Sequence, residues 1–233
     1  MDIIQATELA ITLLIAIVSS LMAYGFFRRY EESLNRSTLF LMTFQILFTV
    51  TYLFQFLIPL FYDPAVAVMV RGSAVHQWLS GITFTLFISF EVLFMSLFAF
   101  EVYSPENAKY LALVPLTVTI LYAYAFLRYG NSLQWTGAFY EWIPSPQLQL
   151  MMEILALFSF LPGLTFVLYS AKVRRDRRKG VLLASGFLII ALFVCVFDNL
   201  AITPPSSMVR LLFILTGLIV VWAGFGQKAQ PIS

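Results

Sequence analysis

Residues 37–61 read STLFLMTFQILFTVTYLFQFLIPLF and contain no charged side chain. A helix that crosses the hydrocarbon core of a bilayer needs about 20 mostly apolar residues. This stretch exceeds that length, and its polar residues are uncharged and mostly isolated. It therefore predicts a transmembrane helix.

The whole chain has a similar composition. Of its 233 residues, 61% are hydrophobic and only 11% are charged, whereas soluble domains devote about 25% of their residues to charge. We expect an all-α integral membrane protein, multi-pass in the cell membrane, in which residues 1–233 form a single seven-transmembrane helical bundle. Division at the charges and at the Pro, Gly and Asn clusters places its helices at approximately 6–27, 37–61, 76–100, 109–128, 147–171, 180–202 and 206–226.

The basic residues predict the orientation of the bundle. Short cytoplasmic loops carry more Lys and Arg than outer loops do. With the N-terminus outside, only Arg71, Arg128 and Arg210 lie on or near the outer side. We therefore expect an outside N-terminus and a cytoplasmic C-terminus.

The densest basic stretch is KVRRDRRKG at 172–180, between the fifth and sixth segments. Such a loop acts as an orientation signal, and it also favours contact with anionic membrane lipids or a cytoplasmic protein partner. The net charge of +2 does not indicate nucleic-acid binding. The cations of this loop are Lys172, Arg174, Arg175, Arg177, Arg178 and Lys179.

Four polar residues gather toward the predicted outer ends of the last three helices: Glu153, Asp198, Asn199 and Arg210. A charge inside a bilayer is costly and needs a protein-facing environment. Asp198 and Arg210 flank one turn, so an ion pair that joins two helices is one interpretation. The other is a site for a small anionic ligand, because the planar guanidinium of Arg210 suits carboxylate or phosphate.

Glu91 lies near the middle of the third segment. Helical spacing predicts a polar stripe on its own helix and another on the preceding helix, which together would form an internal track. The interpretations are an interhelical hydrogen-bond network with a protonated Glu91, or a proton or ion path. The stripe residues are Ser80 and Thr83 beside Glu91, and Gln45, Thr49, Tyr52 and Gln55 on the preceding helix.

Prolines and small residues predict local features of the helices. Pro59, Pro115 and Pro162 remove backbone donors and are expected to kink the helices that contain them. Small residues permit close helix packing. They occur at Ala16, Ser19, Ser20 and Ala23 in the first segment and at Gly217, Gly224 and Gly226 in the last.

Seven helices, an outside N-terminus and short loops resemble the architecture of microbial rhodopsins and, more loosely, of seven-helix receptors. A rhodopsin of that kind carries its retinal on a lysine inside the seventh helix, and residues 206–226 contain none. We therefore expect no covalent retinal, and we predict no other cofactor. The chain also lacks a His-rich metal constellation and a phosphate-binding Gly loop, so neither a metal site nor an enzyme is expected.

Three functions are compatible with these features. The first is a membrane sensor or receptor-like protein that binds a small ligand near the outer side and signals through a cytoplasmic partner. The second is a proton- or ion-coupled carrier that uses Glu91. The third is a non-catalytic membrane subunit of a larger complex, and self-association into a homo-oligomer is compatible with each of them.

Overall fold

The computed structural model describes residues 3–60, 87–129, 131–135, 140–172, 177–193 and 204–226. Nine helices and two strands lie in these ranges. They are α1 (Ile3–Ser33), α2 (Arg36–Leu60), α5 (Ile88–Tyr103), α6 (Ala108–Leu111), α7 (Leu113–Tyr129), β1 (Asn131–Trp135), β2 (Tyr140–Pro144), α8 (Pro146–Ser159), α9 (Leu161–Lys172), α10 (Arg177–Ala191) and α11 (Pro204–Gly226).

The helical bundle predicted from the sequence is confirmed. Each of the seven expected segments contains a helix, with α6 and α7 sharing the fourth segment and α8 and α9 sharing the fifth. Within the part of the chain that the structure describes, five stretches are long and apolar enough to cross a membrane: Ala6–Ser33, Arg36–Leu57, Ala108–Arg128, Pro146–Ala171 and Met208–Gly226. This composition is consistent with a membrane protein.

Two of the prolines coincide with interruptions of a helix. α6 and α7 are separated at Ala112, three residues before Pro115, and α8 and α9 are separated at Phe160, two residues before Pro162. A proline ring clashes with the carbonyl four residues earlier and cannot donate the backbone hydrogen bond of its own turn. At the second break the Phe160 N–H donates instead to Leu157 O at 3.4 Å.

The connection after α7 also contains a β-hairpin, which was not predicted from the sequence. β1 and β2 pair antiparallel, with Leu133 opposite Trp142 and Trp135 opposite Tyr140. Each strand has five residues, and the alternate positions of Leu133 and Trp135 in β1 and of Tyr140 and Trp142 in β2 were the available signal. The chain then enters α8 through Ser145, whose hydroxyl accepts the Leu148 N–H at 3.3 Å and caps the helix.

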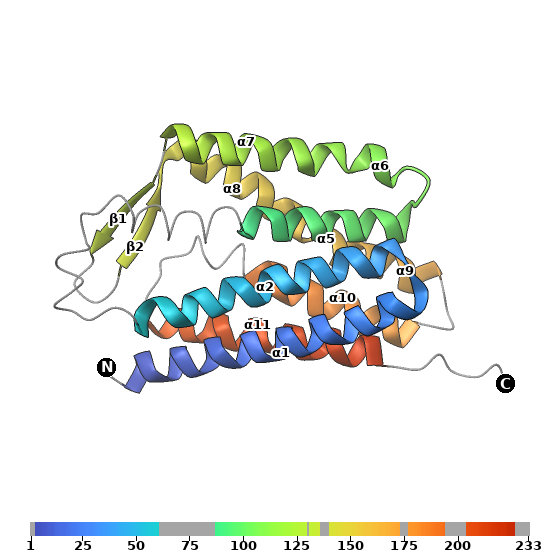
Figure 1. The fold of residues 1–233 in the computed structure, drawn as a ribbon, viewed down its shortest axis with the longest axis horizontal. Helices are drawn as coiled ribbons and strands as arrows, with labels where there is room; N and C mark the ends of the chain where they lie inside the picture. Colours follow the sequence, from blue (N-terminus) through green and yellow to red (C-terminus); the bar gives the residue numbers. More distant parts are fainter. Residues whose placement is uncertain are drawn as a thin grey trace.

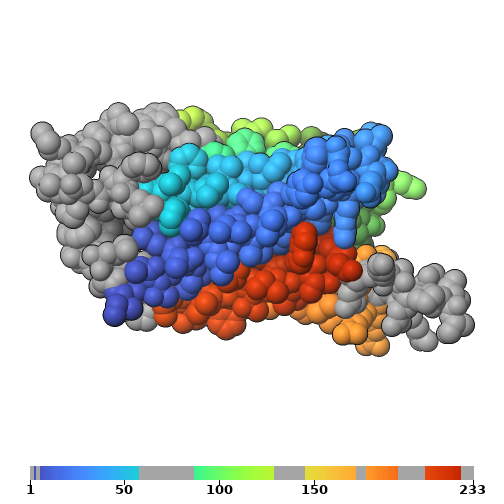
Figure 2. All heavy atoms as spheres, turned by 60° about the horizontal axis from the view of Figure 1, so that its bottom comes forward, coloured from blue at the N-terminus to red at the C-terminus, as the bar shows by residue number. Residues whose placement is uncertain are grey.

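Six of the described helices, which run side by side in Figure 1, contact one another in a closed ring. α1 packs against α2 and α11, α2 packs against α5, α5 packs against α9, and α10 joins α9 to α11. α7 lies outside this ring against α8 and α5. Figure 2 shows one face of the ring, on which α1 lies between α2 and α11.

The buried apolar residues form two clusters, one within the ring of six helices and one beside it. The larger cluster of buried apolar residues joins all six ring helices, and it includes Phe26, Phe48, Phe98, Phe187 and Leu218. A smaller cluster around Tyr122, Phe126 and Leu148 fills the space between α5, α7 and α8.

Several of the small residues noted in the sequence lie at contacts between helices. Ala16, Ser19 and Ala23 are buried, whereas Ser20 is exposed. At Gly217 an added Cβ would lie 3.0 Å from Gly186 O, so α10 and α11 approach with their backbones nearly in contact.

The two ends of the bundle differ in charge. We call the end where α1, α5, α9 and α11 finish and α2, α6 and α10 begin the basic end. Among the described side chains it carries seven cations and four carboxylates: Arg28, Arg29, Arg36, Lys109, Arg177, Arg178 and Lys179, and Glu31, Glu32, Glu101 and Glu106. The opposite end, where α1 begins and the hairpin lies, is the hairpin end (Figure 1).

Candidate functional site

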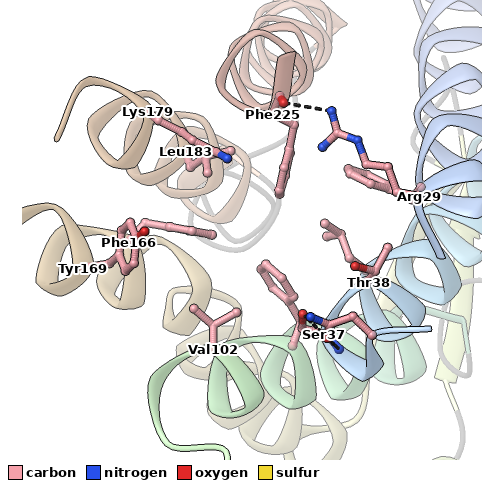
Figure 3. Close-up of a pocket in the computed structure, with 13 residues that line it drawn as sticks. Arg29, Ser37, Thr38, Val102, Phe166, Tyr169, Lys179, Leu183 and Phe225 are labelled. Carbon is pink, nitrogen blue, oxygen red and sulfur yellow. Dashed lines mark hydrogen bonds between the residues drawn. The ribbon is translucent and has the colours of Figure 1, made fainter. Parts of the chain in front are cut away.

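A cavity of about 400 Å³ opens at the basic end, where the ends of all six ring helices converge. Figure 3 shows side chains from these helices pointing into one space, with Arg29 and Lys179 on opposite sides. Pockets for small molecules typically enclose about 300 to 1,000 Å³. The cavity is therefore large enough for a small ligand.

The turn between α1 and α2 forms one side of this cavity. Leu34 takes a left-handed backbone conformation, with φ of 49°, and its N–H donates to Tyr30 O at 2.7 Å, which ends α1. The Asn35 side-chain oxygen then accepts the Ser37 N–H at 2.9 Å and begins α2. This tight turn brings Arg29 of α1 and Ser37 of α2 to one opening.

The floor of the cavity is apolar and buried. It consists of Phe26, Leu41, Phe98, Phe166 and Leu183, each less than 9% exposed. The rings of Phe98 and Phe166 lie 5.8 Å apart between centroids. A further aromatic ring supports them from below, because Phe166 stacks on Phe187 at 5.9 Å with 5° between the ring planes.

The rim of the cavity is polar and carries two cations. Its residues are Arg29 and Asn35, which are exposed, and Ser37, Thr38 and Lys179, which are partly buried. Among the described residues that line the cavity, none is Asp or Glu. The opening therefore favours an anionic group.

Arg29 also joins α1 to the end of α11. Its guanidinium donates to Phe225 O at 2.9 Å and lies 5.9 Å from the centroid of the Phe225 ring (Figure 3). The last carbonyls of a helix have no partner within it and carry partial negative charge, so a cation there is favourable. Phe26 packs edge-on against Phe225 with centroids 4.9 Å apart, which fixes both helices at the cavity wall.

The structure describes two of the four residues predicted to form an outer ligand site, and these two lie on different helices. Glu153 is exposed on α8, where Gln149 Nε2 donates to its Oε1 at 3.4 Å. Arg210 is partly exposed on α11, which packs on α1 and α10, whereas α8 packs mainly on α5, α7 and α9. Asp198 and Asn199 lie outside the described residues.

Glu91 of α5 is 5% exposed, in the contact between α2 and α5. The hydrogen bond that the structure describes to its carboxyl comes from the Thr51 hydroxyl on α2. Thr51 is itself 2% exposed, so this contact joins the two helices inside the bundle.

The structure describes the positions of the four residues in the predicted stripe of α2. Gln45 is buried toward α1, with its Nε2 donating to Met22 Sδ at 3.2 Å, and the Thr49 hydroxyl donates to Gln45 O of its own helix. Tyr52 is buried beside Phe48, and Gln55 is partly buried. Ser80 and Thr83 lie outside the described residues.

Of the basic loop, only its last three cations have described side chains. Arg177 and Arg178 are exposed in the first turn of α10, and Lys179 lines the cavity. Lys172 ends α9, and Arg174 and Arg175 lie outside the described residues.

Two functional candidates, Arg29 and Thr51, were absent from the predicted site. The sequence placed the end of the first helix near residue 27, which assigned Arg29 to a loop, whereas α1 continues to Ser33. Thr51 lies seven residues after Phe44 and three after Phe48, and both of these rings are buried. That spacing was the available signal, because residues three, four and seven apart share one helical face.

Comparisons with known proteins give no family for this chain, since no family model, curated protein or solved structure matches it.

Proposed function

We propose that this protein is a receptor-like membrane protein that binds a small anionic ligand in the cavity at its basic end. The observation that carries the proposal is the combination of two rim cations, Arg29 and Lys179, with a described lining that includes no carboxylate. Charge-assisted hydrogen bonds are stronger than neutral ones, and the guanidinium fork binds carboxylate or phosphate with two parallel bonds.

The position of the cavity supports a signalling role. Its walls come from six helices, so a ligand that fits one arrangement of the helix ends better than another shifts the bundle toward that arrangement. In the orientation predicted from the Lys and Arg distribution, the basic end faces the cytoplasm. A cytoplasmic partner at Arg177 and Arg178, both exposed at the start of α10, would then sense the change.

Inorganic phosphate is the first probe of this proposal. With purified protein in neutral detergent and ionic strength held constant by sodium chloride, we expect a saturable rise in the thermal unfolding midpoint. A phosphate concentration about fivefold above Kd stabilises the folded state by about 1 kcal/mol. That free energy raises the midpoint by roughly 2 to 4 °C.

Arg29→Gln and Lys179→Gln should each weaken phosphate binding at least about tenfold, because a hydrogen bond to a charged group contributes about 1.5 to 3 kcal/mol. Arg28→Gln is the matched control, since Arg28 is exposed on the same helix and lies 3.9 Å from Glu31. Comparison with and without phosphate within each variant removes any effect on stability alone. Equal phosphate affinity in Arg29→Gln and Arg28→Gln would contradict the proposal.

A proton- or ion-coupled carrier is a second candidate, supported by the burial of Glu91 and its hydrogen bond from Thr51. A carboxyl group within a membrane helix bundle is a common element of proton pathways. In liposomes with an imposed pH gradient, Glu91→Gln should reduce proton flux at least about tenfold if the group carries the proton. Glu153→Gln, which alters an exposed carboxylate, should leave the flux unchanged, and equal fluxes in the two variants would exclude this function.

A further inference from the structure

We infer that the ligand of the cavity is an amphiphilic phosphate monoester, with its phosphate at the Arg29 and Lys179 rim and its hydrocarbon part on the aromatic floor. This inference rests on the proposed function, because it names the chemical class of ligand for the same site. It depends on the separation of the lining into a polar rim and an apolar floor.

The two rim cations match a phosphate monoester in charge and geometry. Such a group carries about −1.5 to −2 charges near neutral pH and three acceptor oxygens. Arg29 offers a planar fork and Lys179 a point charge from the opposite side (Figure 3). A guanidinium has five N–H donors, so the bond from Arg29 to Phe225 O leaves capacity for the phosphate.

A neutral donor supplements the rim. The Ser37 and Thr38 side chains line the cavity in the first turn of α2. The Ser37 N–H and hydroxyl both donate to Asn35 Oδ1 at 2.9 Å, so the Thr38 hydroxyl is the neutral group suited to a phosphate oxygen. It supplements the two cations, which carry the recognition.

The floor indicates that the ligand has a hydrocarbon part. Phe26, Leu41, Phe98, Phe166 and Leu183 are buried beneath the rim. A hydrophilic anion alone would leave this apolar surface in contact with water, whereas an alkyl chain would remove it from water. Phe166 cannot retreat easily to close the space, because it stacks on Phe187 and contacts Phe98.

Alkyl phosphates of increasing chain length test this inference. We would measure the binding of inorganic phosphate, ethyl phosphate, butyl phosphate and octyl phosphate, with octanol as the uncharged control. Each buried methylene strengthens binding roughly fourfold, so octyl phosphate should bind at least about tenfold more tightly than inorganic phosphate. Native mass spectra should show one bound octyl phosphate that is lost in Arg29→Gln and retained in Arg28→Gln.

The substitution Val102→Phe tests the contribution of the apolar floor separately from that of the polar rim. Val102 is partly buried in the last turn of α5 and lines the cavity, so the larger ring would occupy the space for the chain and leave both cations in place. The variant should lose most of the gain in affinity from inorganic phosphate to octyl phosphate that the wild type shows. If Val102→Phe does not fold, the chain-length series in the wild type still decides the question.

The outcomes separate the inference from the proposed function. Octyl phosphate that binds no more tightly than inorganic phosphate, with both depending on Arg29, would overturn the amphiphile and leave the anion site intact. Binding of every phosphate that is unchanged by both Arg29→Gln and Lys179→Gln would overturn both. A gain from the octyl chain that persists in Val102→Phe would assign the chain to another surface and also overturn the inference.

Reconstitution distinguishes a membrane source from a soluble one. In vesicles of phosphatidylcholine alone, octyl phosphate should raise the unfolding midpoint. If the natural ligand is a lipid, vesicles that also contain phosphatidic acid should already show the higher midpoint, and octyl phosphate should add little. If octyl phosphate retains its full effect there, the ligand is a soluble phosphate ester of the same class.

Discussion

Gly186→Val is expected to separate α10 from α11 and to lower the unfolding free energy by roughly 2 to 3 kcal/mol, the upper part of the range for overpacked sites. A Cβ at Gly186 would lie 2.6 Å from Val221 Cγ2, 2.8 Å from Gly217 O and 2.9 Å from Val221 N. Two of these three atoms belong to the backbone of α11, so a change of side-chain rotamer cannot relieve the contact. The midpoint of thermal unfolding in detergent should fall by roughly 5 to 10 °C.

Gly226→Val is the matched control for this substitution. Gly226 is also helical, at the end of α11, but no described heavy atom lies within 4 Å of a Cβ placed there. Its effect should stay within about 0.5 kcal/mol, as for an exposed surface position. Gly186→Ala should fall between the two, because its added methyl meets the same backbone atoms while Ala gains about 1 kcal/mol of helix propensity. Equal midpoints for Gly186→Val and Gly226→Val would show that the two helices can separate without loss of stability.

The same pair of helices shows what the sequence could predict. Close packing was expected at Gly217, Gly224 and Gly226, and the structure places neighbours beside the first two only. Small residues establish that a close approach is possible, but the direction each one faces depends on the rotation of the helix. The opposing Gly186 was not singled out, because its role appears only when α10 is set against α11.

The length of α1 explains why Arg29 was absent from the predicted site. Apolar composition ends near residue 27, and two arginines follow. The helix nevertheless continues to Ser33, and it includes an Arg28 to Glu31 contact at 3.9 Å with spacing i, i+3. Hydropathy marks where a helix leaves the hydrocarbon core rather than where the helix ends. The added turn is what directs Arg29 to the cavity and to Phe225 O.

Thr51→Val is expected to lower the unfolding free energy by about 1 kcal/mol or slightly more, through the contact between α2 and α5. Valine has nearly the shape of threonine, so the packing is kept and the hydrogen bond to Glu91 is removed. The buried Glu91 carboxyl loses a hydrogen-bond donor. The free energy lost in this way at a buried group exceeds the contribution of a typical exposed hydrogen bond. Thermal or denaturant unfolding in detergent measures the difference.

Thr49→Val provides the control on the same helix. Both threonines are buried, but the Thr49 hydroxyl donates to Gln45 O within α2 at 2.8 Å, whereas the Thr51 hydroxyl reaches α5. A bond from threonine to the carbonyl four residues earlier contributes little to helix stability. Thr49→Val should therefore change the unfolding free energy by less than about 0.5 kcal/mol. If both variants lose the same stability, the bond between Thr51 and Glu91 is not what holds the two helices together.

The complementary substitution, Glu91→Met, should cost less than Thr51→Val, although it removes the ionisable partner of the same bond. Without Glu91, the Thr51 hydroxyl can rotate to the carbonyl of its own helix four residues earlier, as Thr49 already does. In Thr51→Val, by contrast, the Glu91 carboxyl loses the hydrogen-bond donor that the structure describes for it. The double variant Thr51→Val/Glu91→Met should recover most of the stability lost in Thr51→Val, since removal of both polar partners leaves neither group unsatisfied. A double variant that is less stable than Thr51→Val would instead mean that the carboxyl is bonded more strongly by other groups than by Thr51.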